Sequence, residues 1–255
     1  MPRPGDAAEC LVGRNAVREA LRAGRRRVSQ VLLAEGMADK GIITEIEALA
    51  RAAGVRVARA RREELDRLGG ELLHQGVAAQ VSAYPYCTLE QVLAVPAQCG
   101  EAPFFLALDS IQDPQNLGSL LRTAEAVGIH GVILPDRRAA GITPAASRAS
   151  AGAAEHLHVA QVTNLVRTLE ALKEAGVWIV GGEEHPQSVD YRRPALNLPV
   201  ALVLGSEGQG MRRLVAETCD LLLRIPMRGQ VGSLNVSVAG GILLYHLLAA
   251  RQSAT

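Results

Sequence analysis

The stretch ALVLGSEGQGM, residues 201–211, decides the fold class, because an apolar run passes directly into a loop that holds three glycines. An apolar run without polar alternation is typical of a strand buried on both faces, as in a parallel sheet. Gly205, Gly208 and Gly210 then let the backbone approach a ligand or take a positive φ. The loop lacks the GK[ST] of a P-loop and the GxGxxG spacing of dinucleotide-binding folds. These residues alone leave open whether it is a ligand loop or a tight structural turn.

Similar apolar runs occur elsewhere in the second half of the chain, and segments with helical spacing separate several of them. The predicted elements are strands at 104–109, 131–135 and 177–181, and helices at 116–127, 164–175 and 233–250. This pattern indicates an α/β fold whose parallel sheet is covered on both faces. Open parallel sheets bind ligands beyond the carboxyl ends of their strands, so the loops there are the expected site.

The first 83 residues show the same alternation on a smaller scale. The predicted elements are helices at 15–22, 44–53 and 63–68, and strands at 31–34, 55–58 and 77–83. The stretch 84–103 has three prolines and no basic residue, which is typical of a linker with one short helix. We therefore predict an N-terminal α/β domain over residues 1–83, a linker over 84–102 and a second domain over 103–255.

The composition excludes several classes of protein. Of the 255 residues, 48% are apolar and 21% charged, which is ordinary globular usage and not that of a disordered or collagen-like chain. The four cysteines lie far apart without zinc-site spacing. The N-terminus lacks a signal-peptide pattern, and the most apolar window, 232–250, is interrupted by Ser233, Asn235 and His246. We expect a cytoplasmic protein that binds neither metal nor membrane.

The basic residues are concentrated at the N-terminus. Residues 1–82 hold 14 Lys or Arg against 11 Asp or Glu, a net charge of +3, although the whole chain carries only +1. They are bunched around 14–27 and 51–62. Such clusters are solvated helix faces by default, and contact with nucleic-acid phosphates is the alternative.

Two further segments carry polar side chains at predicted helix starts. In DPQNLGSLLR, 113–122, Asp113 is a good N-cap and Asn116 and Arg122 lie on a polar stripe. In the segment 225–248, Ser233 and Asn235 precede an almost wholly apolar helix. Both segments fit either plain capped helices or ligand contacts. Neither a nucleophile elbow nor a Cys-His signature supports covalent catalysis.

The motifs NLGSLLR (116–122), LGSEGQGM (204–211) and IPMRGQVGSLNVSVAGG (225–241), in this order and spacing, resemble the SpoU family of RNA ribose 2′-O-methyltransferases, part of the SPOUT class. The boxes VGRNAVREAL (12–21) and LLHQGVAAQV (72–81) make the chain most similar to the bacterial 23S ribosomal RNA (guanosine-2′-O-)-methyltransferase group. The resemblance covers nearly the whole chain.

The resemblance implies a fold and partners that the strand pattern does not. The N-terminal domain would be L30e-like and bind RNA, and the parallel-sheet domain would contain a deep trefoil knot, although chain connections rarely thread loops. The cofactor would be S-adenosyl-L-methionine and the substrate a guanosine of 23S ribosomal RNA. A homodimer through the catalytic domain is also implied.

The resemblance also assigns residues of this chain to a site. The cofactor contacts implied are Leu204, Gly205, Ile225, Met227 and Leu234. The catalytic polar positions are Asn116, Arg122, Glu207, Ser233 and Asn235. In the family the arginine corresponding to Arg122 is given the deprotonating role. A guanidinium is ordinarily a donor and not a base, so two roles stay open, a base or a cation that clamps a phosphate and stabilises the developing alkoxide.

Three alternatives compete with this hypothesis. A nucleotide-binding oxidoreductase requires the GxGxxG motif that the chain lacks. A non-catalytic RNA-binding or ribosome-assembly factor on the same fold would have lost Arg122 or Asn235, and both are present. A transfer RNA ribose methyltransferase of the same family would carry other extensions than this N-terminal domain. The identity of the modified nucleotide is not encoded in any of these motifs.

Overall fold

The computed structural model describes residues 9–38 and 40–252, and the chain divides into two compact units. Residues 1–85 and 142–156 form the first, called the N-terminal unit, and residues 86–141 and 157–255 form the second, called the C-terminal unit. Residues 142–156 thus belong to a different unit from the sequence that flanks them. Among the described helices, none is long and apolar enough to cross a membrane.

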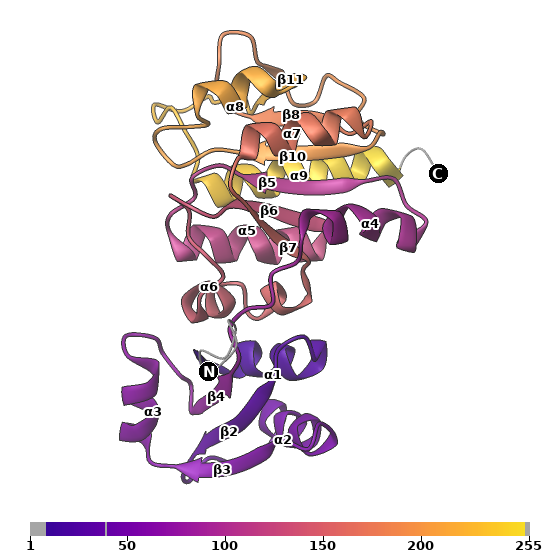
Figure 1. Cartoon of the computed structure of the whole chain (residues 1–255). Coiled ribbons are helices and arrows are strands. Elements are labelled where there is room, and N and C mark those ends of the chain that lie inside the picture. Colours follow the sequence, from indigo (N-terminus) through magenta and orange to yellow (C-terminus); the bar gives the residue numbers. More distant parts are fainter. Residues whose placement is uncertain (1–8, 39, 253–255) are drawn as a thin grey trace. The chain divides into compact units, whose positions relative to one another are not determined.

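A mixed four-stranded sheet organises the N-terminal unit (Figure 1), with strand order β1-β4-β2-β3. Its elements are β1 (Glu9–Val12), α1 (Arg14–Ala23), β2 (Val28–Ala34), α2 (Ile42–Ala52), β3 (Arg56–Ala60), α3 (Arg62–Gly69), β4 (Val77–Val81), α6 (Pro144–Ala149) and the 3-10 helix η1 (Ala153–His156). Only β2 and β3 pair in parallel. The strand β1 was not predicted from the sequence.

The two faces of this sheet are covered by different helices. Leu11 and Leu33 face the helices α1 and α2, whereas Val12 and Leu32 face Leu65 of α3. Consecutive residues point to opposite faces because the side-chain period of a strand is two. Both faces are apolar, which explains why 31–34 reads as an unbroken apolar run.

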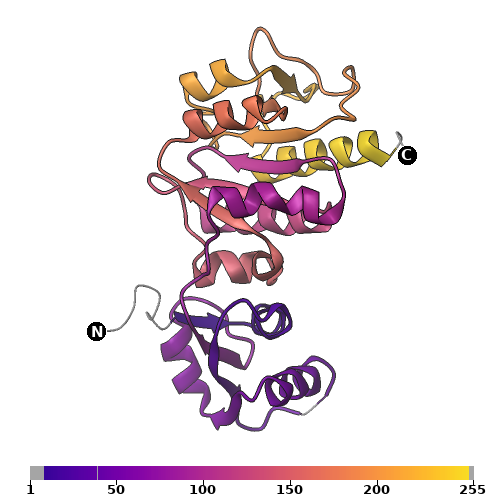
Figure 2. The same cartoon turned by 45° about the vertical axis from the view of Figure 1, so that its right-hand side comes forward.

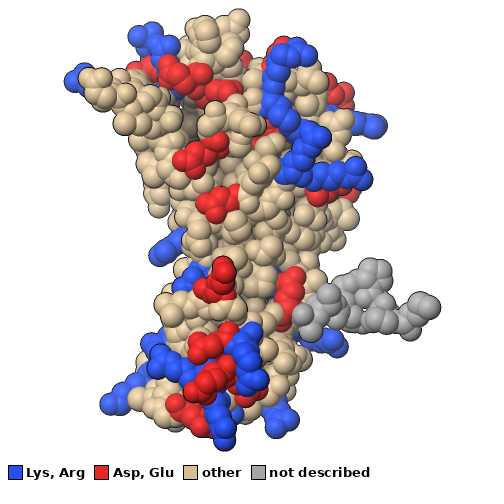
Figure 3. Space-filling model, turned by 90° about the vertical axis from the view of Figure 1, so that its left-hand side faces the viewer, with Lys and Arg blue, Asp and Glu red and all other residues tan. Residues whose placement is uncertain are grey.

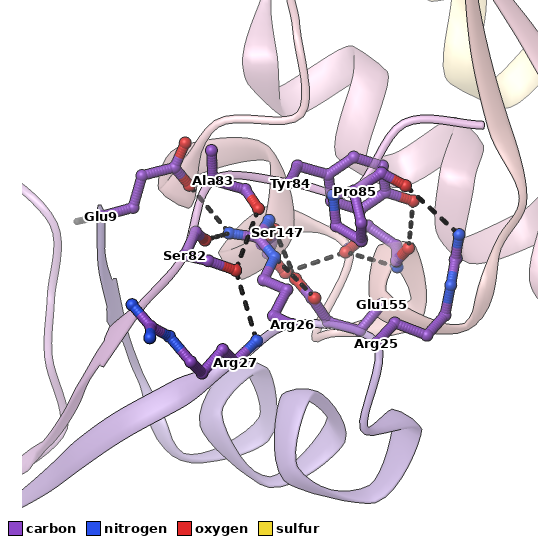
Figure 4. Close-up of polar contacts among 12 residues, drawn as sticks. Glu9, Arg25, Arg26, Arg27, Ser82, Ala83, Tyr84, Pro85, Ser147 and Glu155 are labelled. Atoms are coloured by element: carbon purple, nitrogen blue, oxygen red, sulfur yellow. Dashed lines mark hydrogen bonds and ion pairs between the residues drawn. The ribbon is translucent and has the colours of Figure 1, made fainter. Parts of the chain in front are cut away.

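A buried polar cluster joins residues 142–156 to the rest of the N-terminal unit (Figure 4). Arg26 Nε lies 2.9 Å from Glu155 Oε2, and both side chains are almost fully buried. Arg26 Nη1 also donates to Glu9 Oε2 at 2.8 Å, and its guanidinium carbon lies 5.0 Å from the ring centre of Tyr84. The Ser147 hydroxyl donates to Glu155 Oε1 at 2.9 Å. A buried charge is tolerated only when it is paired in this way.

The C-terminal unit contains a seven-stranded sheet of order β7-β6-β5-β10-β8-β11-β9, in which every pairing between described strands is parallel. Its elements are α4 (Leu89–Cys99), β5 (Phe104–Leu108), α5 (Pro114–Ala126), β6 (Gly131–Pro135), β7 (Val159–Val162), α7 (Leu165–Glu174), β8 (Trp178–Gly182), β9 (Val189–Asp190), β10 (Val200–Leu204), α8 (Arg213–Thr218), β11 (Leu221–Arg224) and α9 (Val236–Gln252). The α/β class and the parallel sheet predicted from the sequence are confirmed.

Helices cover both faces of this sheet (Figures 1 and 2). The helices α4, α7 and α8 pack on one face through residues such as Val92, Leu169 and Val215. On the other face α5 and α9 lie together, and Gly240 of α9 allows close contact, because a Cβ there would overlap Leu120 of α5. The fold therefore brings the starts of α5 and α9 near the carboxyl end of the central strand β10.

Candidate active site

A cavity of about 330 Å³ lies beyond the carboxyl ends of β8, β10 and β11. This is within the range of roughly 300–1,000 Å³ for small-molecule sites. Its walls come from residues 182–184 at the end of β8, the loop 205–210 after β10, residues 223–225 and 227 at the end of β11, and residues 232–234 and 236 at the start of α9. Strand ends of a parallel sheet are the expected place for a ligand.

The loop 205–211 has a shape that its glycines make possible. Ser206 and Gly210 exchange two backbone hydrogen bonds of 3.0 Å, so the loop closes into a tight turn with Glu207 near its tip. A Cβ at residue 205 would overlap the backbone of Gly210 and Met211. Gly208, at the tip, has a φ of 83°, which favours glycine. Gly210 has a φ of 66°, and a Cβ there would overlap the Glu183 carboxylate, so the shape of the turn favours glycine at all three positions.

Four of the five residues expected to contact the cofactor line this cavity: Gly205, Ile225, Met227 and Leu234. The fifth, Leu204, is buried at the end of β10 behind the loop, where a Cβ on Gly240 would come within 2.7 Å of its Cδ1. Its side chain packs between the sheet and α9. The chain reaches the cavity wall at the next residue, Gly205.

Three of the expected polar residues, from three separate segments, meet in one cluster. Asn116 Nδ2 donates to Glu207 Oε2 at 3.0 Å, and Asn235 Nδ2 donates to Asn116 Oδ1 at 2.8 Å. Asn235 Nδ2 is also 3.4 Å from Glu207 Oε2. Glu207 lines the cavity, so this polar cluster lies at its edge.

Helix starts position the two asparagines of the polar cluster. Asp113 caps α5 by accepting from the backbone N–H of Asn116 at 3.2 Å, and Pro114 occupies the first turn. Asn235 Oδ1 accepts from the backbone N–H of Ser237 at 2.9 Å, which is the geometry of a helix N-cap. The side-chain amide of Asn116 and the Nδ2 group of Asn235 take no part in these caps, and they bond to Glu207 and to each other.

The predicted start of the last helix at residue 233 is wrong by three residues, because α9 begins at Val236. Ser233 is a good capping residue by type, but Asn235 takes the capping position. Ser233 instead lies in the preceding loop and lines the cavity.

Arg122 lies apart from the polar cluster. It is exposed on α5, six residues beyond Asn116, or about 9 Å along the helix axis at 1.5 Å per residue. Within the described ranges 9–38 and 40–252, its guanidinium makes no hydrogen bond or ion pair, and it is not a lining residue of the cavity. Arg122 is therefore available to a group from outside the chain.

The cavity has a negative lining that the sequence motifs did not reveal. Three carboxylates, those of Glu183, Glu184 and Glu207, line it with one guanidinium, that of Arg224. Glu183 Oε1 also accepts from the backbone N–H of Met211 at 3.2 Å. The position of Glu183 directly after an apolar strand was the only signal that could have singled it out. Such a lining favours a ligand that carries positive charge.

Many basic residues of the N-terminal unit are already paired. Arg18 Nε lies 2.6 Å from Glu19 and Arg59 Nη2 lies 3.1 Å from Glu47. On the face drawn in Figure 3, basic and acidic side chains of this unit are interleaved. Among its described residues, four arginines make no side-chain hydrogen bond or ion pair: Arg51, Arg56, Arg61 and Arg62. All four belong to the second of the two basic clusters, 51–62, whereas the arginines of 14–27 all have partners.

Comparison with known families agrees with this architecture. The model of the SpoU rRNA Methylase family matches residues 103–245, more than half of the chain. The model described as RNA 2′-O ribose methyltransferase substrate binding matches residues 10–87.

Relatives and solved structures match along almost the whole chain. A putative TrmH family tRNA/rRNA methyltransferase of Bacillus subtilis, YacO, is 47% identical over 238 residues, which are 93% of this chain and 94% of the relative. The structure of an AdoMet-bound rRNA methyltransferase from Sinorhizobium meliloti has a TM-score of 0.77 at 26% identity, covering 97% of this chain and 88% of that one. The structure of an RNA 2′-O ribose methyltransferase also has a TM-score of 0.77, at 25% identity, covering 97% and 90%.

The fold, the cavity and these similarities define an RNA methyltransferase that uses S-adenosyl-L-methionine as its cofactor. The chain belongs to the SpoU rRNA methylase family, whose relatives include TrmH-family tRNA/rRNA methyltransferases. The resemblance stated from the sequence motifs is thereby confirmed.

Proposed function

We propose that this protein transfers the methyl group of S-adenosylmethionine to a ribose 2′-hydroxyl of structured RNA, and that a guanosine of 23S ribosomal RNA is the target. The observation that carries this proposal is the polar cluster of Asn116, Glu207 and Asn235 at the edge of a cavity that a glycine-rich loop lines. Acceptors and donors held in fixed positions are what the alignment of a hydroxyl requires.

The cavity suits the cofactor in charge and in shape. S-adenosylmethionine brings an activated methyl group on a sulfonium cation, together with an ammonium group. The carboxylates of Glu183, Glu184 and Glu207 favour these cations over a neutral or anionic ligand. Gly205 leaves backbone exposed to a ligand, and Ile225, Met227 and Leu234 offer apolar surface and backbone groups around it.

The chain's own residues would orient the hydroxyl and receive its proton. The Glu207 carboxylate accepts from the amides of Asn116 and Asn235, which fixes the carboxylate for contact with a substrate. Arg122 has a free guanidinium, which suits a phosphate of the RNA, and the choice between base and clamp stays open. Ser233 lines the cavity and would contribute a hydroxyl group. Positioning of this kind supplies roughly 7–11 kcal/mol to a reaction.

Binding of RNA would fall to the N-terminal unit. Its match to a substrate-binding model and its unpaired arginines support this assignment. We retain the domain division of the sequence prediction, with substrate binding over 1–83 and catalysis over 103–255, as part of the proposal. A cytoplasmic location accords with such a substrate.

A homodimer through the catalytic domain is also part of the proposal. Val238 and Tyr245 on α9 are 50% and 54% exposed, which leaves apolar surface on that helix for a second copy. Light scattering of the purified protein tests it. A monomer at all concentrations up to those of the activity assay would contradict it.

The test of the function has two parts. Calorimetry should detect binding of S-adenosylmethionine and no binding of NAD or ATP. Mapping of 2′-O-methylated nucleotides in a deletion strain should then show one guanosine of 23S ribosomal RNA unmethylated and restored by the gene. Loss of a transfer RNA methylation would instead support the transfer RNA enzyme, which the name of the Bacillus subtilis relative also covers. Unchanged methylation in both RNA classes would support the non-catalytic factor.

A further inference from the structure

Asp109 is a fully buried carboxylate at the carboxyl end of β5, outside the polar cluster. Its Oδ2 accepts from the backbone N–H of Arg212 at 2.8 Å, and its Oδ1 accepts from Arg212 Nε at 2.7 Å. The Ser110 hydroxyl donates to Oδ1 at 3.2 Å. These donors compensate the burial of the carboxylate, because a buried charge without partners would cost several kcal/mol.

The bonds of Asp109 close the loop 205–211 at both of its ends. The backbone N–H of Asp109 donates to the carbonyl of Leu204 at 2.7 Å, just before the loop, while its carboxylate holds Arg212 just after it. One residue of the neighbouring strand therefore fixes where the loop leaves the sheet and where it returns. On the other side, Glu183 at the end of β8 holds Met211.

The same residue also begins the connection to the helix that carries the catalytic candidates. Asp109 is followed by only four residues before α5 starts at Pro114, and Asn116 in the first turn of α5 contacts Glu207 of the loop. A displacement of Asp109 would consequently move both partners of the contact between Asn116 and Glu207. Displacements of about 1 Å can reduce a catalytic rate by 10²-fold.

We propose that Asp109 and Arg212 are positioning residues, which hold the loop 205–211 in the shape that lines the cofactor cavity and presents Glu207 to Asn116. This inference rests on the proposed function of that cavity. Arg212 contributes little to the core, since its side chain is 49% exposed. Arg212 contributes two hydrogen bonds to the buried Asp109 carboxylate, one from its backbone N–H and one from its side-chain Nε.

The test replaces Arg212 and its exposed neighbour in matched variants. Arg212→Ala removes the side-chain donor to Asp109, and we expect the dissociation constant for S-adenosylmethionine to rise about tenfold or more, the scale of one hydrogen bond to a charged group. Arg213→Ala is the control, because Arg213 is 76% exposed and, among the described residues, its side chain pairs only with Glu217. It should bind the cofactor like the unaltered protein.

Two readouts separate positioning from a general loss of stability. Far-UV circular dichroism at the temperature of the calorimetry must show folded protein for both variants. Arg212→Lys, which keeps a cation near Asp109, should recover part of the affinity. If Arg212→Ala does not fold, Asp109→Asn takes its place, because it keeps the size and removes the charge. It should then show the same loss of cofactor affinity.

The outcomes of these experiments distinguish the positioning role of Asp109 and Arg212 from the proposed methyltransferase function. No cofactor binding by the unaltered protein would refute the proposed function. Cofactor binding by the unaltered protein, with an equal dissociation constant for a folded Arg212→Ala or Asp109→Asn variant, would refute the positioning role alone. If Arg212→Ala and Arg213→Ala lose the same amount of cofactor affinity, the positioning role is likewise refuted.

Discussion

At the scale of the residue, Arg122 of α5 is exposed and lies outside both the cavity lining and the polar cluster. Its guanidinium has no partner among the described residues, although Leu121 and Leu120 beside it are fully buried. The helix is therefore held by its leucines, and Arg122 contributes almost nothing to packing. A side chain of this kind is either an ordinary surface arginine or a contact to the substrate.

Replacement of Arg122 decides between these two possibilities. Arg122→Ala should leave the fold and the cofactor dissociation constant unchanged and reduce methyl transfer by about 10² or more, the scale of losing a positioned electrostatic or acid–base group. Steady-state kinetics with intact RNA, together with calorimetry, measures both quantities. A loss of less than tenfold would make Arg122 an ordinary surface residue.

Arg122→Lys then separates the base from the clamp. A lysine keeps the charge but not the planar, bidentate fork of the guanidinium. If Arg122 clamps a phosphate by charge alone, the lysine variant should retain a substantial part of the rate. If the fork or a base is required, it should be nearly as inactive as the alanine variant.

At the scale of the element, the loop 205–211 depends on a close approach of its two backbone segments, which leaves no room for a side chain at residue 205. Gly205→Ala would bring a Cβ into the backbone of Gly210 and Met211, so the turn must open. We expect the cofactor affinity to fall by more than tenfold and methyl transfer by about 10² or more, because Glu207 moves away from Asn116. Calorimetry and the methyl-transfer assay measure the two losses.

Gly229→Ala is the matched control for the loop. Gly229 also lies in a loop of the C-terminal unit, but a Cβ there has no described atom within 4 Å. Its cofactor affinity should equal that of the unaltered protein. Equal effects of the two substitutions would show that the glycine at 205 matters only for general stability.

The sequence predicted the long and strongly patterned elements better than the short ones. Apolar runs such as 104–108 and 200–204 are strands because both faces of the sheet are covered. The four-residue strands β7 and β11 were not among the predicted strands, because so few residues carry little pattern of their own. The trefoil knot stays a prediction from the resemblance.

The polar cluster was predicted from motif order and not from local physics. Glu207 lies 91 residues after Asn116 and 28 residues before Asn235. No helical or strand period relates residues so far apart. Glu183 and Asp109 escaped the sequence motifs for a related reason. Each acts through a backbone N–H of a loop whose course only the folded sheet defines.

At the scale of the whole molecule, the two compact units are not continuous stretches of the chain. Residues 142–156 belong to the compact N-terminal unit, although they lie between β6 and β7 of the other unit. The chain therefore passes between the units three times, at residues 85, 141 and 156. Composition gave no sign of this, because small residues such as those of TPAASRASAGAA fit many environments.

The ion pair of Arg26 and Glu155 is the interaction that most clearly ties residues 142–156 to this unit. Removal of one partner from a buried ion pair costs about 3–5 kcal/mol, because the other charge stays buried without compensation. We therefore expect Arg26→Ala to lower the free energy of unfolding by that amount at pH 7.5, measured by urea denaturation. Arg61→Ala, which removes an exposed arginine without a described partner, should change it by less than about 0.5 kcal/mol.

This loss should depend on pH, because Glu155 can escape its unpaired charge by binding a proton. Burial raises the pKa of Glu155, and the Arg26 guanidinium and the Ser147 hydroxyl oppose the rise. Without Arg26 the pKa rises further above that of the unfolded chain, about 4.3. A carboxyl whose pKa is raised on folding contributes stability that is complete below the unfolded pKa and is lost as the pH rises through the folded pKa. The difference in unfolding free energy between Arg26→Ala and the unaltered protein should therefore be smaller at pH 5 than at pH 7.5. A difference that is the same at both pH values would show that Glu155 is not the charge that Arg26 neutralises.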